Sequence, residues 1–398
     1  MIKISRRAQL LKPSATLAMA AKARQMKAAG INVISFATGE PDFDTPVAIR
    51  DAAKRALDEG HTRYTPSSGI PELKAAIREK LRRDEGLNYA DDEVIVTCGA
   101  KQAIYDALQV MIDPGDEVII PAPYWVSYPE QVQLAGGMPV FVKADEGNAF
   151  KVTPSQIERA ASPRTRAIIL NYPSNPTGNT YARAELAALG KACTDRGIAI
   201  ISDEIYEKLI YTDTAHASIA AAHPPAKNLT IVVNGVSKAY AMTGWRMGYA
   251  AGPREVIGKM GALVEQENSG IPGFVQKACV AALSGQQDEV LRMRDEFRTR
   301  RDLMLERMLA IPGVRCHVPD GTFYLLPNMR TFIGRSAGSR HITDATALAE
   351  YLLESAHIAT VSGDPFGVPG YIRLSYATSR ENIEEGMRRL AEALAKLT

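Results

Sequence analysis

Seven short β-rich runs alternate with stretches of helical spacing between about residue 90 and residue 252, and this alternation constrains the fold more than any other feature of the chain. Several of the runs are continuously apolar, which is typical of strands that are covered on both faces. The alternation predicts an α/β fold with a mostly parallel sheet wrapped by helices. The runs are VIVTCG (94–99), EVIIPA (117–122), PVFVKA (139–144), AIILNY (167–172), IAIISDE (198–204), LTIVVNG (229–235) and MGYAAG (247–252).

A second, shorter set of elements follows a charged amphipathic stretch at residues 285–310, which we interpret as a connecting helix. The chain of 398 residues is long enough for more than one domain. We predict a large domain over residues 47–285 and a smaller α/β domain built from residues 1–46 and 286–398. The second set comprises a strand-like run at 321–327, a helix around 343–356, the run YIRLSY at 371–376 and a final helix near 380–397.

Composition excludes several classes of protein. Apolar residues make up 46% and charged residues 23% of the chain, as in ordinary globular proteins. The net charge is +2 and no basic block occurs, so nucleic acid is not an expected partner. The four cysteines form no C-x-x-C pair, which argues against a zinc site. No signal-peptide core and no apolar run of membrane-spanning length is present, so we expect a cytoplasmic protein that does not enter a membrane.

The motifs of several common enzyme classes are missing. The sequence contains no dinucleotide-binding glycine motif after a strand, no P-loop, no H-E-x-x-H and no EF-hand loop. The six histidines are scattered, which gives little support to a histidine-based metal site. Residues 235–239 resemble the G-x-S-x-G turn of serine hydrolases only in part, because Ala239 stands in place of the second glycine. A serine hydrolase is therefore disfavoured.

Three polar residues follow apolar strands of the predicted sheet: Asn175, Asp203 and Lys238. Parallel strands place their carboxyl ends at one edge of the sheet, where ligands bind. A lysine that can form a Schiff base and a carboxylate that keeps a pyridine nitrogen protonated are what a pyridoxal phosphate site requires. Each residue also has an ordinary structural explanation, since Asn175 would suit a turn, Asp203 a helix cap and Lys238 a solvated surface.

Longer motifs around these residues resemble the class I aminotransferases of fold type I, which depend on pyridoxal phosphate. The similarity extends over residues 5–395, and KPSAT (12–16) with GAKQA (99–103) is similar to the bacterial branch of aspartate and aspartate/prephenate aminotransferases. The motifs are SNPTG (174–178), SDEIYE (202–207), SKAYAMTGWRMGY (237–249), TGEPDFDTP (38–46), YTPSSGIPELKAAI (64–77), PYWVSYPE (123–130) and YIRLSY (371–376).

The resemblance implies a role for each residue around the cofactor ring. Lys238 would bind the cofactor covalently and act as the base of the proton shift. Asp203 would pair with the ring nitrogen. Tyr206 and the amide of Asn175 would donate hydrogen bonds to the ring oxygen, and Trp125 would stack on the ring face. Trp125 also has an alternative explanation as an ordinary core aromatic.

The resemblance also implies a phosphate site where the run at 94–99 turns into a helix, because backbone N–H groups at a helix start bind anions. Gly235 stands where many relatives have a second phosphate-binding serine, so the site would have one donor fewer. Tyr64 would reach the phosphate from the other subunit of a homodimer with shared active sites. The phosphate-binding residues implied are Gly99, Ala100, Lys101, Ser237, Arg246 and Tyr64.

For the substrate, the resemblance assigns Arg373 to the α-carboxylate, a role that suits the two-pronged guanidinium group. Gly39 would bring its backbone near the same carboxylate, with Trp125 and Asn175 close by. A distal carboxylate would be read by Lys101 and by the KPSAT segment, which favours a dicarboxylic substrate such as aspartate. Lys101 would otherwise be a solvated first-turn lysine. The residues of that segment concerned are Lys12, Ser14 and Thr16.

The expected reaction is a ping-pong transamination, in which aspartate leaves as oxaloacetate and 2-oxoglutarate leaves as glutamate. The segment NSGIPGFVQ (268–276) differs from the Ser/Thr-rich stretch usual in the branch, and an altered entrance would admit aromatic or larger keto acids. Tyr172 replaces smaller residues of the bifunctional members, which argues against prephenate. The alternatives are an enzyme that prefers prephenate or aromatic acids, a β-lyase on the same fold, and a non-catalytic effector-binding module, which the lack of an attached DNA-binding segment disfavours.

Overall fold

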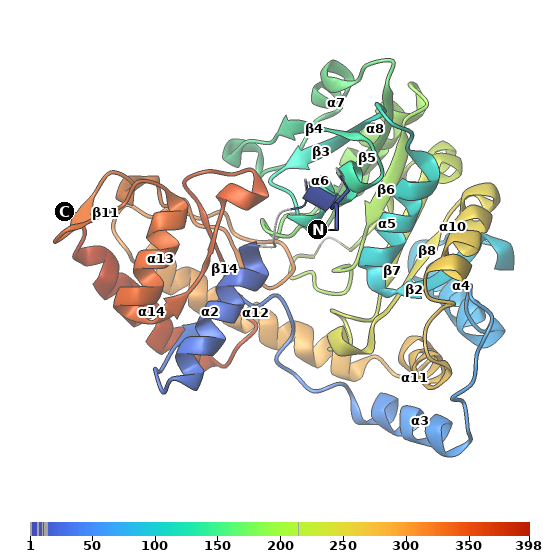
Figure 1. Ribbon diagram of the computed structural model, residues 1–398, viewed down its shortest axis with the longest axis horizontal. Helices are drawn as coiled ribbons and strands as arrows, with labels where there is room; N and C mark the ends of the chain where they lie inside the picture. Colours follow the sequence, from blue (N-terminus) through green and yellow to red (C-terminus); the bar gives the residue numbers. More distant parts are fainter. Residues whose placement is uncertain (1, 6–7, 10, 12–14, 214) are drawn as a thin grey trace.

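A seven-stranded sheet in the order β2-β8-β7-β6-β5-β3-β4 forms the centre of the computed structural model, which describes residues 2–5, 8–9, 11, 15–213 and 215–398 (Figure 1). All of its strands run in one direction except β8, which is antiparallel to both neighbours. The predicted α/β fold with a mostly parallel sheet is thus confirmed. The strands are β2 (Val94–Cys98), β3 (Glu117–Ala122), β4 (Met138–Lys143), β5 (Thr165–Asn171), β6 (Ala199–Asp203), β7 (Thr230–Gly235) and β8 (Met247–Ala251).

Helices cover both faces of this sheet. Successive residues of a strand point to opposite faces, so each strand contributes side chains to two cores. Ile201 and Val233 are buried against helices α5 (Gly99–Met111) and α10 (Arg254–Glu267) on one face. Ile200 is buried on the other face, in the core that includes Leu186 of α8 (Arg183–Thr194). Burial on both faces explains why these strands read as continuous apolar runs.

The C-terminal third and the N-terminal segment form a second region. Helix α12 (Asp288–Leu309) runs from beside α14 (Arg380–Ala395) toward α11 (Gly273–Ser284) (Figure 1). Strand β1 (Ile34–Ser35) pairs with β12 (Ile358–Ala359) in parallel, so the N-terminal segment joins the C-terminal elements. Domain boundaries at residues 46/47 and 285/286 stay a prediction. The three-stranded sheet of this region has the order β13 (Val361–Ser362), β14 (Ile372–Ser375), β9 (Tyr324–Leu325).

The other helices and strands connect these elements. A short hairpin of β10 (Ser336–Ala337) and β11 (Arg340–His341) lies beside the C-terminal residue Thr398, which exchanges backbone hydrogen bonds with Ser336. These elements are α2 (Ala15–Ala28), α3 (Val47–Asp58), α4 (Pro71–Glu85), α6 (Ser127–Leu134), α7 (Pro154–Ala160), α9 (Ile219–Ala222), β10 (Ser336–Ala337), β11 (Arg340–His341) and α13 (Ala345–Ala356).

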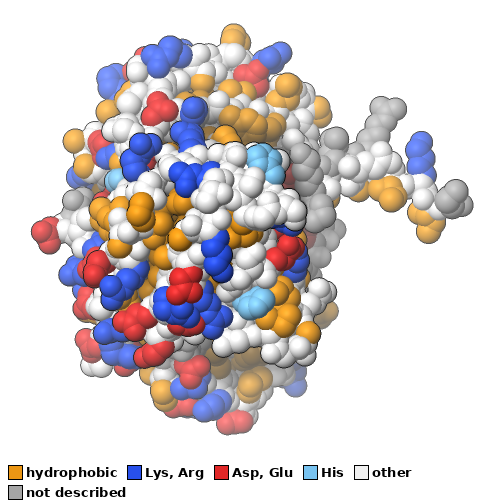
Figure 2. All heavy atoms as spheres, turned by 90° about the vertical axis from the view of Figure 1, so that its left-hand side faces the viewer, with side chains coloured by type: hydrophobic (Ala, Val, Ile, Leu, Met, Phe, Trp, Pro, Cys, Tyr) orange, Lys and Arg blue, Asp and Glu red, His pale blue; other side chains and the backbone are white. Residues whose placement is uncertain are grey.

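The surface carries charges of both signs. Acidic and basic side chains are interspersed on the face shown in Figure 2, as the small net charge of +2 leads one to expect. None of the helices in the described part of the chain combines the length and the apolar character that crossing a bilayer requires.

Candidate active site

A cavity of about 440 Å³ lies at the carboxyl ends of β5, β6 and β7, where parallel sheets bind ligands. Helix α5, helix α2 and strand β14 contribute further lining residues, so segments distant in sequence meet here. Most of the predicted site residues line it. These are Gly39, Ala100, Lys101, Trp125, Asn175, Asp203, Tyr206, Ser237, Lys238, Arg246 and Arg373.

Asp203 is the last residue of β6 and is buried. The hydroxyl of Tyr128 donates a hydrogen bond of 2.6 Å to Asp203 Oδ2, and the backbone N–H of Ile205 donates to Oδ1 at 3.3 Å. Burial raises the pKa of Asp203 to about 6, with a further contribution from the neighbouring Glu204, while the two hydrogen bonds oppose the rise. At neutral pH Asp203 therefore presents a buried carboxylate to the cavity.

Lys238 follows β7, and its Nζ donates a hydrogen bond of 2.7 Å to the carbonyl oxygen of Gly39. Burial lowers the pKa of Lys238 to about 8, and repulsion from Arg373 and Arg246 adds to this, against attraction by Glu40 and Asp203. An amine with this pKa is partly unprotonated near neutral pH, which suits it to act as a nucleophile and as a base.

Position 39 favours glycine because Tyr324 lies close to its Cα. A Cβ atom at this position would lie 2.5 Å from the hydroxyl oxygen of Tyr324, which is buried. No side chain fits there without displacing Tyr324. The backbone of residue 39 can therefore approach Lys238 only as glycine.

Arg373 of β14 is a buried cation whose hydrogen bonds go to neutral oxygen atoms. Its Nη1 donates to Asn175 Oδ1 at 3.0 Å, and its Nη2 donates to the carbonyl oxygen of Ala37 at 2.8 Å. The guanidinium lies 4.4 Å from the ring centroid of Tyr324, and Nε has no hydrogen-bond partner among the described residues. A buried guanidinium without an anion is costly, so this group suits a carboxylate ligand.

Two aromatic side chains complete the wall near Asp203. The hydroxyl of Tyr206 lies 3.1 Å from that of Tyr324. Trp125 packs edge-on against Tyr128, with ring centroids 5.4 Å apart. Both Tyr206 and Trp125 line the cavity, which places a hydroxyl group and a flat aromatic face beside the buried carboxylate.

The start of α5 is the predicted anion site. Gly99 has a φ of +76°, and a Cβ there would lie 2.5 Å from Nη2 of Arg246. Arg246 itself has a φ of 56° and donates hydrogen bonds to the carbonyl oxygens of Thr243 and Cys98. Together with Ser237, these groups bring a guanidinium, a hydroxyl and the N-terminal backbone of α5 to one end of the cavity.

Gly235 has a steric explanation. A Cβ at this position would lie 2.7 Å from the carbonyl oxygen of Met247 on the neighbouring strand β8. The side chain of a serine here would collide with that backbone, which accounts for the glycine at this position.

Some predicted residues lie elsewhere. Tyr64 is 96% exposed and does not line the cavity, so its contact with a second subunit stays a prediction. Lys12 and Ser14 lie outside the described residues, and so does the side chain of Thr16. Lys101 is exposed, with Nζ 4.8 Å from the ring centroid of Trp125, and lines both the cavity and the neighbouring groove.

The expectations about substrate choice for Tyr172 and for residues 268–276 need correction. Tyr172 is buried, does not line the cavity and turns its hydroxyl toward Ser202 and Glu204. It therefore cannot obstruct prephenate in the way that the sequence suggested. Residues 268–276 also contribute nothing to the cavity within one chain; Gln276 there accepts a hydrogen bond from the backbone of Ile70.

Sequence reasoning missed several lining residues: Arg24, Tyr128, Asn171 and Tyr324. Tyr128 stands three residues after Trp125, a helical spacing that would have placed both on one side. Asn171 binds the backbone of Asp203 and Asn175 and thereby joins two strand ends. Arg24 and Tyr324 come from segments whose approach to the sheet has no local signal.

Comparison with known proteins places this chain in a family. The family model of aminotransferases of class I and II matches residues 31–390. The aspartate aminotransferase of Geobacillus stearothermophilus is 50% identical over 98% of both proteins, and the aspartate/prephenate aminotransferase of Cereibacter sphaeroides is 48% identical over 98% of both. The crystal structure of the aspartate aminotransferase from Rhizobium meliloti matches with a TM-score of 0.97 and 42% identity over 100% of both chains. The chain therefore belongs to the class I and II aminotransferases.

Proposed function

We propose that the protein is a pyridoxal phosphate-dependent aminotransferase that transfers the amino group of L-aspartate to 2-oxoglutarate, giving oxaloacetate and L-glutamate. The observation that carries the proposal is the meeting of Lys238, Asp203 and Arg373 in one cavity. These three side chains supply an amine, a buried carboxylate and a carboxylate-binding cation. A purely structural role would not explain why three residues so far apart in the sequence meet in one cavity.

The residues of the cavity fit pyridoxal phosphate. Asp203 would bind the protonated ring nitrogen, Tyr206 and Asn175 the ring oxygen, and Trp125 the ring face. The phosphate would lie at the start of α5 and bind Ala100, Lys101, Ser237 and Arg246 beside Gly99. When bound, the cofactor supplies an electron sink for the negative charge that develops at the substrate Cα.

Lys238 holds the proton that moves in the reaction. With a pKa of about 8, its amine would take up a proton from the substrate Cα and release one again, because both protonation states are accessible near neutral pH. In the structure Gly39 accepts a hydrogen bond from Nζ, which holds the amine at the cavity.

Arg373 binds and orients the substrate α-carboxylate. In the structure its two Nη atoms are held by Asn175 Oδ1 and the carbonyl oxygen of Ala37, which keep the guanidinium in place. A carboxylate that approaches this fork receives two parallel charge-assisted hydrogen bonds. Its fixed orientation presents the Cα–H bond to Lys238.

Aspartate is supported by the names of the relatives and by cations near the rim. Lys101 and Arg24 both line the cavity and would attract a distal carboxylate, together with Lys12, Ser14 and Thr16. Prephenate is the second candidate, because a relative that is 48% identical is named aspartate/prephenate aminotransferase. The buried orientation of Tyr172 removes the argument against it.

We also propose that the protein works as a cytoplasmic homodimer with shared active sites, in which the exposed Tyr64 binds the phosphate of the partner chain. The large domain would comprise residues 47–285, and the small domain residues 1–46 and 286–398. The parallel pairing of β1 with β12 supports joining the two small-domain segments.

A spectral titration tests the proposal. The purified protein is loaded with pyridoxal phosphate and mixed with single amino acids, and the visible absorbance of the cofactor is followed. Aspartate and glutamate should convert the cofactor to its amino form and bleach the band, and 2-oxoglutarate should restore it. Release of a leaving group from Cβ without conversion would indicate a β-lyase. A chain that takes up no cofactor would refute the proposal.

A further inference from the structure

The segment after β6 contributes to two separate clusters. Asp203 and Tyr206 line the cavity, whereas Glu204 and Glu207 do not, and both glutamates are buried. Glu204 directly follows Asp203 and is 0% exposed. Two consecutive buried carboxylates repel each other unless one of them is neutralised.

Glu204 is surrounded by hydrogen-bond donors. Its Oε1 accepts from the hydroxyls of Ser202 at 2.8 Å, Ser218 at 2.7 Å and Tyr172 at 3.1 Å. Its Oε2 lies 3.0 Å from Nε2 of His216. Among these partners only the imidazole can carry a positive charge, so His216 is the group that can neutralise Glu204.

The pKa of His216 is set by competing effects. Burial lowers the pKa of His216. The hydrogen bond and charge of Glu204 raise this pKa, as do the charges of Glu85 and Glu207, and the net shift is upward. The ring also stacks on Tyr172 at a centroid distance of 5.7 Å. His216 is therefore favoured in its charged form beside Glu204.

The other charges that face His216 are matched among themselves. Lys80 of α4 pairs with Glu207, and Lys208 pairs with Asp84. Burial raises the pKa of Glu85 to about 7, against attraction by His216, so that this carboxyl is largely protonated in the acid range. Further titratable groups that bear on these charges are Tyr89, Tyr240 and Tyr249.

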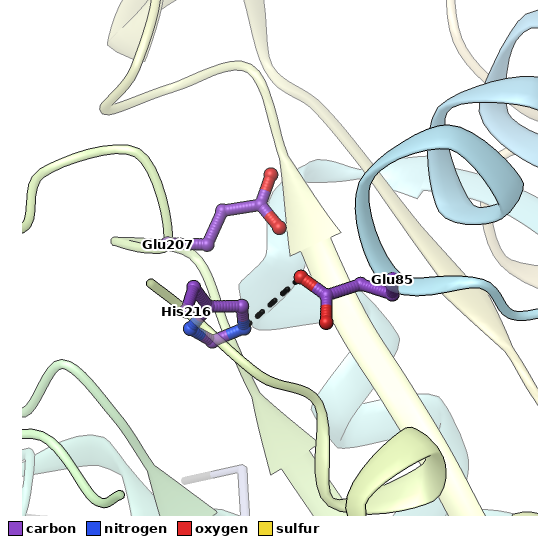
Figure 3. Close-up of side chains that lie close together, drawn as sticks. All are labelled: Glu85, Glu207 and His216. Atoms are coloured by element: carbon purple, nitrogen blue, oxygen red, sulfur yellow. Dashed lines mark ion pairs between the residues drawn. The ribbon is translucent and has the colours of Figure 1, made fainter. Parts of the chain in front are cut away.

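Glu85, Glu207 and His216 point toward one another, an arrangement that also resembles a metal site (Figure 3). The ligand atoms are already engaged, however. Nε2 of His216 binds Glu204, and its distance to Glu85 Oε1 is 3.9 Å. The ammonium group of Lys80 forms an ion pair with the carboxylate of Glu207. The cluster thus contains its own cation, and we interpret it as an ion network.

We infer that His216, acting through Glu204, is a positioning residue that keeps Asp203 ionised for the cofactor nitrogen. The inference rests on the proposed function. Without the imidazolium, Glu204 would add an uncompensated negative charge next to Asp203 and favour its protonation. A protonated Asp203 would no longer hold a protonated ring nitrogen. The network thus lies outside the cavity and influences it through the charge of one carboxylate.

The test measures the dissociation constant of pyridoxal phosphate from the apoprotein between about pH 5 and pH 8, in wild type, His216→Gln, Glu204→Gln and the double variant. In wild type the affinity for pyridoxal phosphate should fall on acidification as Asp203 takes up a proton, and the acid midpoint is the pH at which half of this change has occurred. In His216→Gln the acid midpoint should move upward by about one pH unit, because the negative charge of Glu204 beside Asp203 remains uncompensated. In Glu204→Gln it should move downward. The double variant, which removes both charges, should return toward the wild-type midpoint.

The cofactor phosphate titrates in the same way in every variant, so differences between variants isolate the protein groups. His223→Gln serves as the matched control, because His223 is half-buried and contacts the hydroxyl of Thr194 at 3.2 Å. Its midpoint should equal that of wild type. If His216→Gln fails to fold, Glu204→Gln and the double variant still decide the question.

Shifts of the same sign in both single variants, or no shift, would overturn the inference and leave the proposed function intact. Additive losses without recovery in the double variant would indicate a merely structural role and count against it equally. A wild-type protein that binds no pyridoxal phosphate would instead refute the proposed function, and the inference with it.

Discussion

The sheet edge and the rim of the cavity are built differently. Asp203 accepts hydrogen bonds from Tyr128 and Ile205, and Lys238 donates one to the carbonyl oxygen of Gly39, so both side chains are held at strand ends. Lys101 and Arg24, by contrast, are exposed and come from two helices in separate parts of the chain, the first turn of α5 and the C-terminal half of α2. The difference teaches that the groups proposed for chemistry are preorganised by the sheet, whereas those proposed for substrate choice depend on flexible cationic side chains.

The comparison is tested most strongly by Lys238→Ala. We expect transaminase activity to fall by about 10⁴-fold or more, because the covalent and proton-transfer steps lose their amine. Borohydride reduction of the loaded wild-type protein, followed by peptide mapping, should place the cofactor on Lys238. The Lys101→Ala variant should still carry the reduced cofactor on Lys238. Label recovered on Lys101 would show that the rim, and not the sheet edge, holds the reacting amine.

Asp203→Ala should have the next largest effect. Removal of a preorganised charge of this kind costs about 3–4 kcal/mol in the transition state, which corresponds to about 10²–10³-fold in kcat. Steady-state kinetics and circular dichroism would measure the loss and check the fold. Asp195→Ala, an exposed residue paired with Lys191, is the control. Near-normal turnover of Asp203→Ala would contradict the proposed mechanism.

Lys101→Ala addresses the rim. Loss of a charge-assisted contact of about 1.5–3 kcal/mol should lower kcat/KM for aspartate by roughly ten- to a hundredfold, with a much smaller change for an aromatic amino acid. Kinetics with both substrates would measure the ratio. Equal losses would leave Lys101 with phosphate binding alone or with a scaffold role, and aspartate would no longer be favoured.

Tyr64→Phe should have the smallest effect, because it removes one hydrogen bond. We expect cofactor affinity to fall by about two- to tenfold, which corresponds to about 0.5–1.5 kcal/mol. In mixed dimers of Tyr64→Phe with Lys238→Ala, the site that retains Lys238 should bind the cofactor with wild-type affinity, since both lesions then fall in the other site. Verified subunit exchange in which that site keeps the lowered affinity of Tyr64→Phe would argue against a site shared between chains.

The sheet edge was predictable from sequence because its residues depend on local pattern. Asp203 and Lys238 directly follow apolar runs, and the carboxyl ends of parallel strands necessarily meet. Tyr128 was missed, since it stands 75 residues from Asp203 and reaches it from helix α6. Its spacing from Trp125 indicates only that the two side chains share a side, whereas the contact with Asp203 depends on how helix α6 packs on the sheet.

The rim was harder to predict for a related reason. Tyr172 follows strand β5, yet its ring lies on the other side of the strand end and joins Glu204 and His216. Which face a residue takes at the end of a strand depends on the first residues of the following turn. His216 had no motif of its own, and only its contact with Glu204 distinguishes it from the other scattered histidines.

Arg246 carries a standing conformational cost. A residue with a side chain in the left-handed region of backbone space loses roughly 1–2 kcal/mol relative to glycine, and the φ of Arg246 is 56°. A laboratory selection for heat resistance alone would accept glycine at this position, because the strain is relieved. The same exchange would discard the guanidinium proposed for the phosphate. Libraries of thermostabilised variants should therefore be screened for cofactor retention as well as for melting temperature.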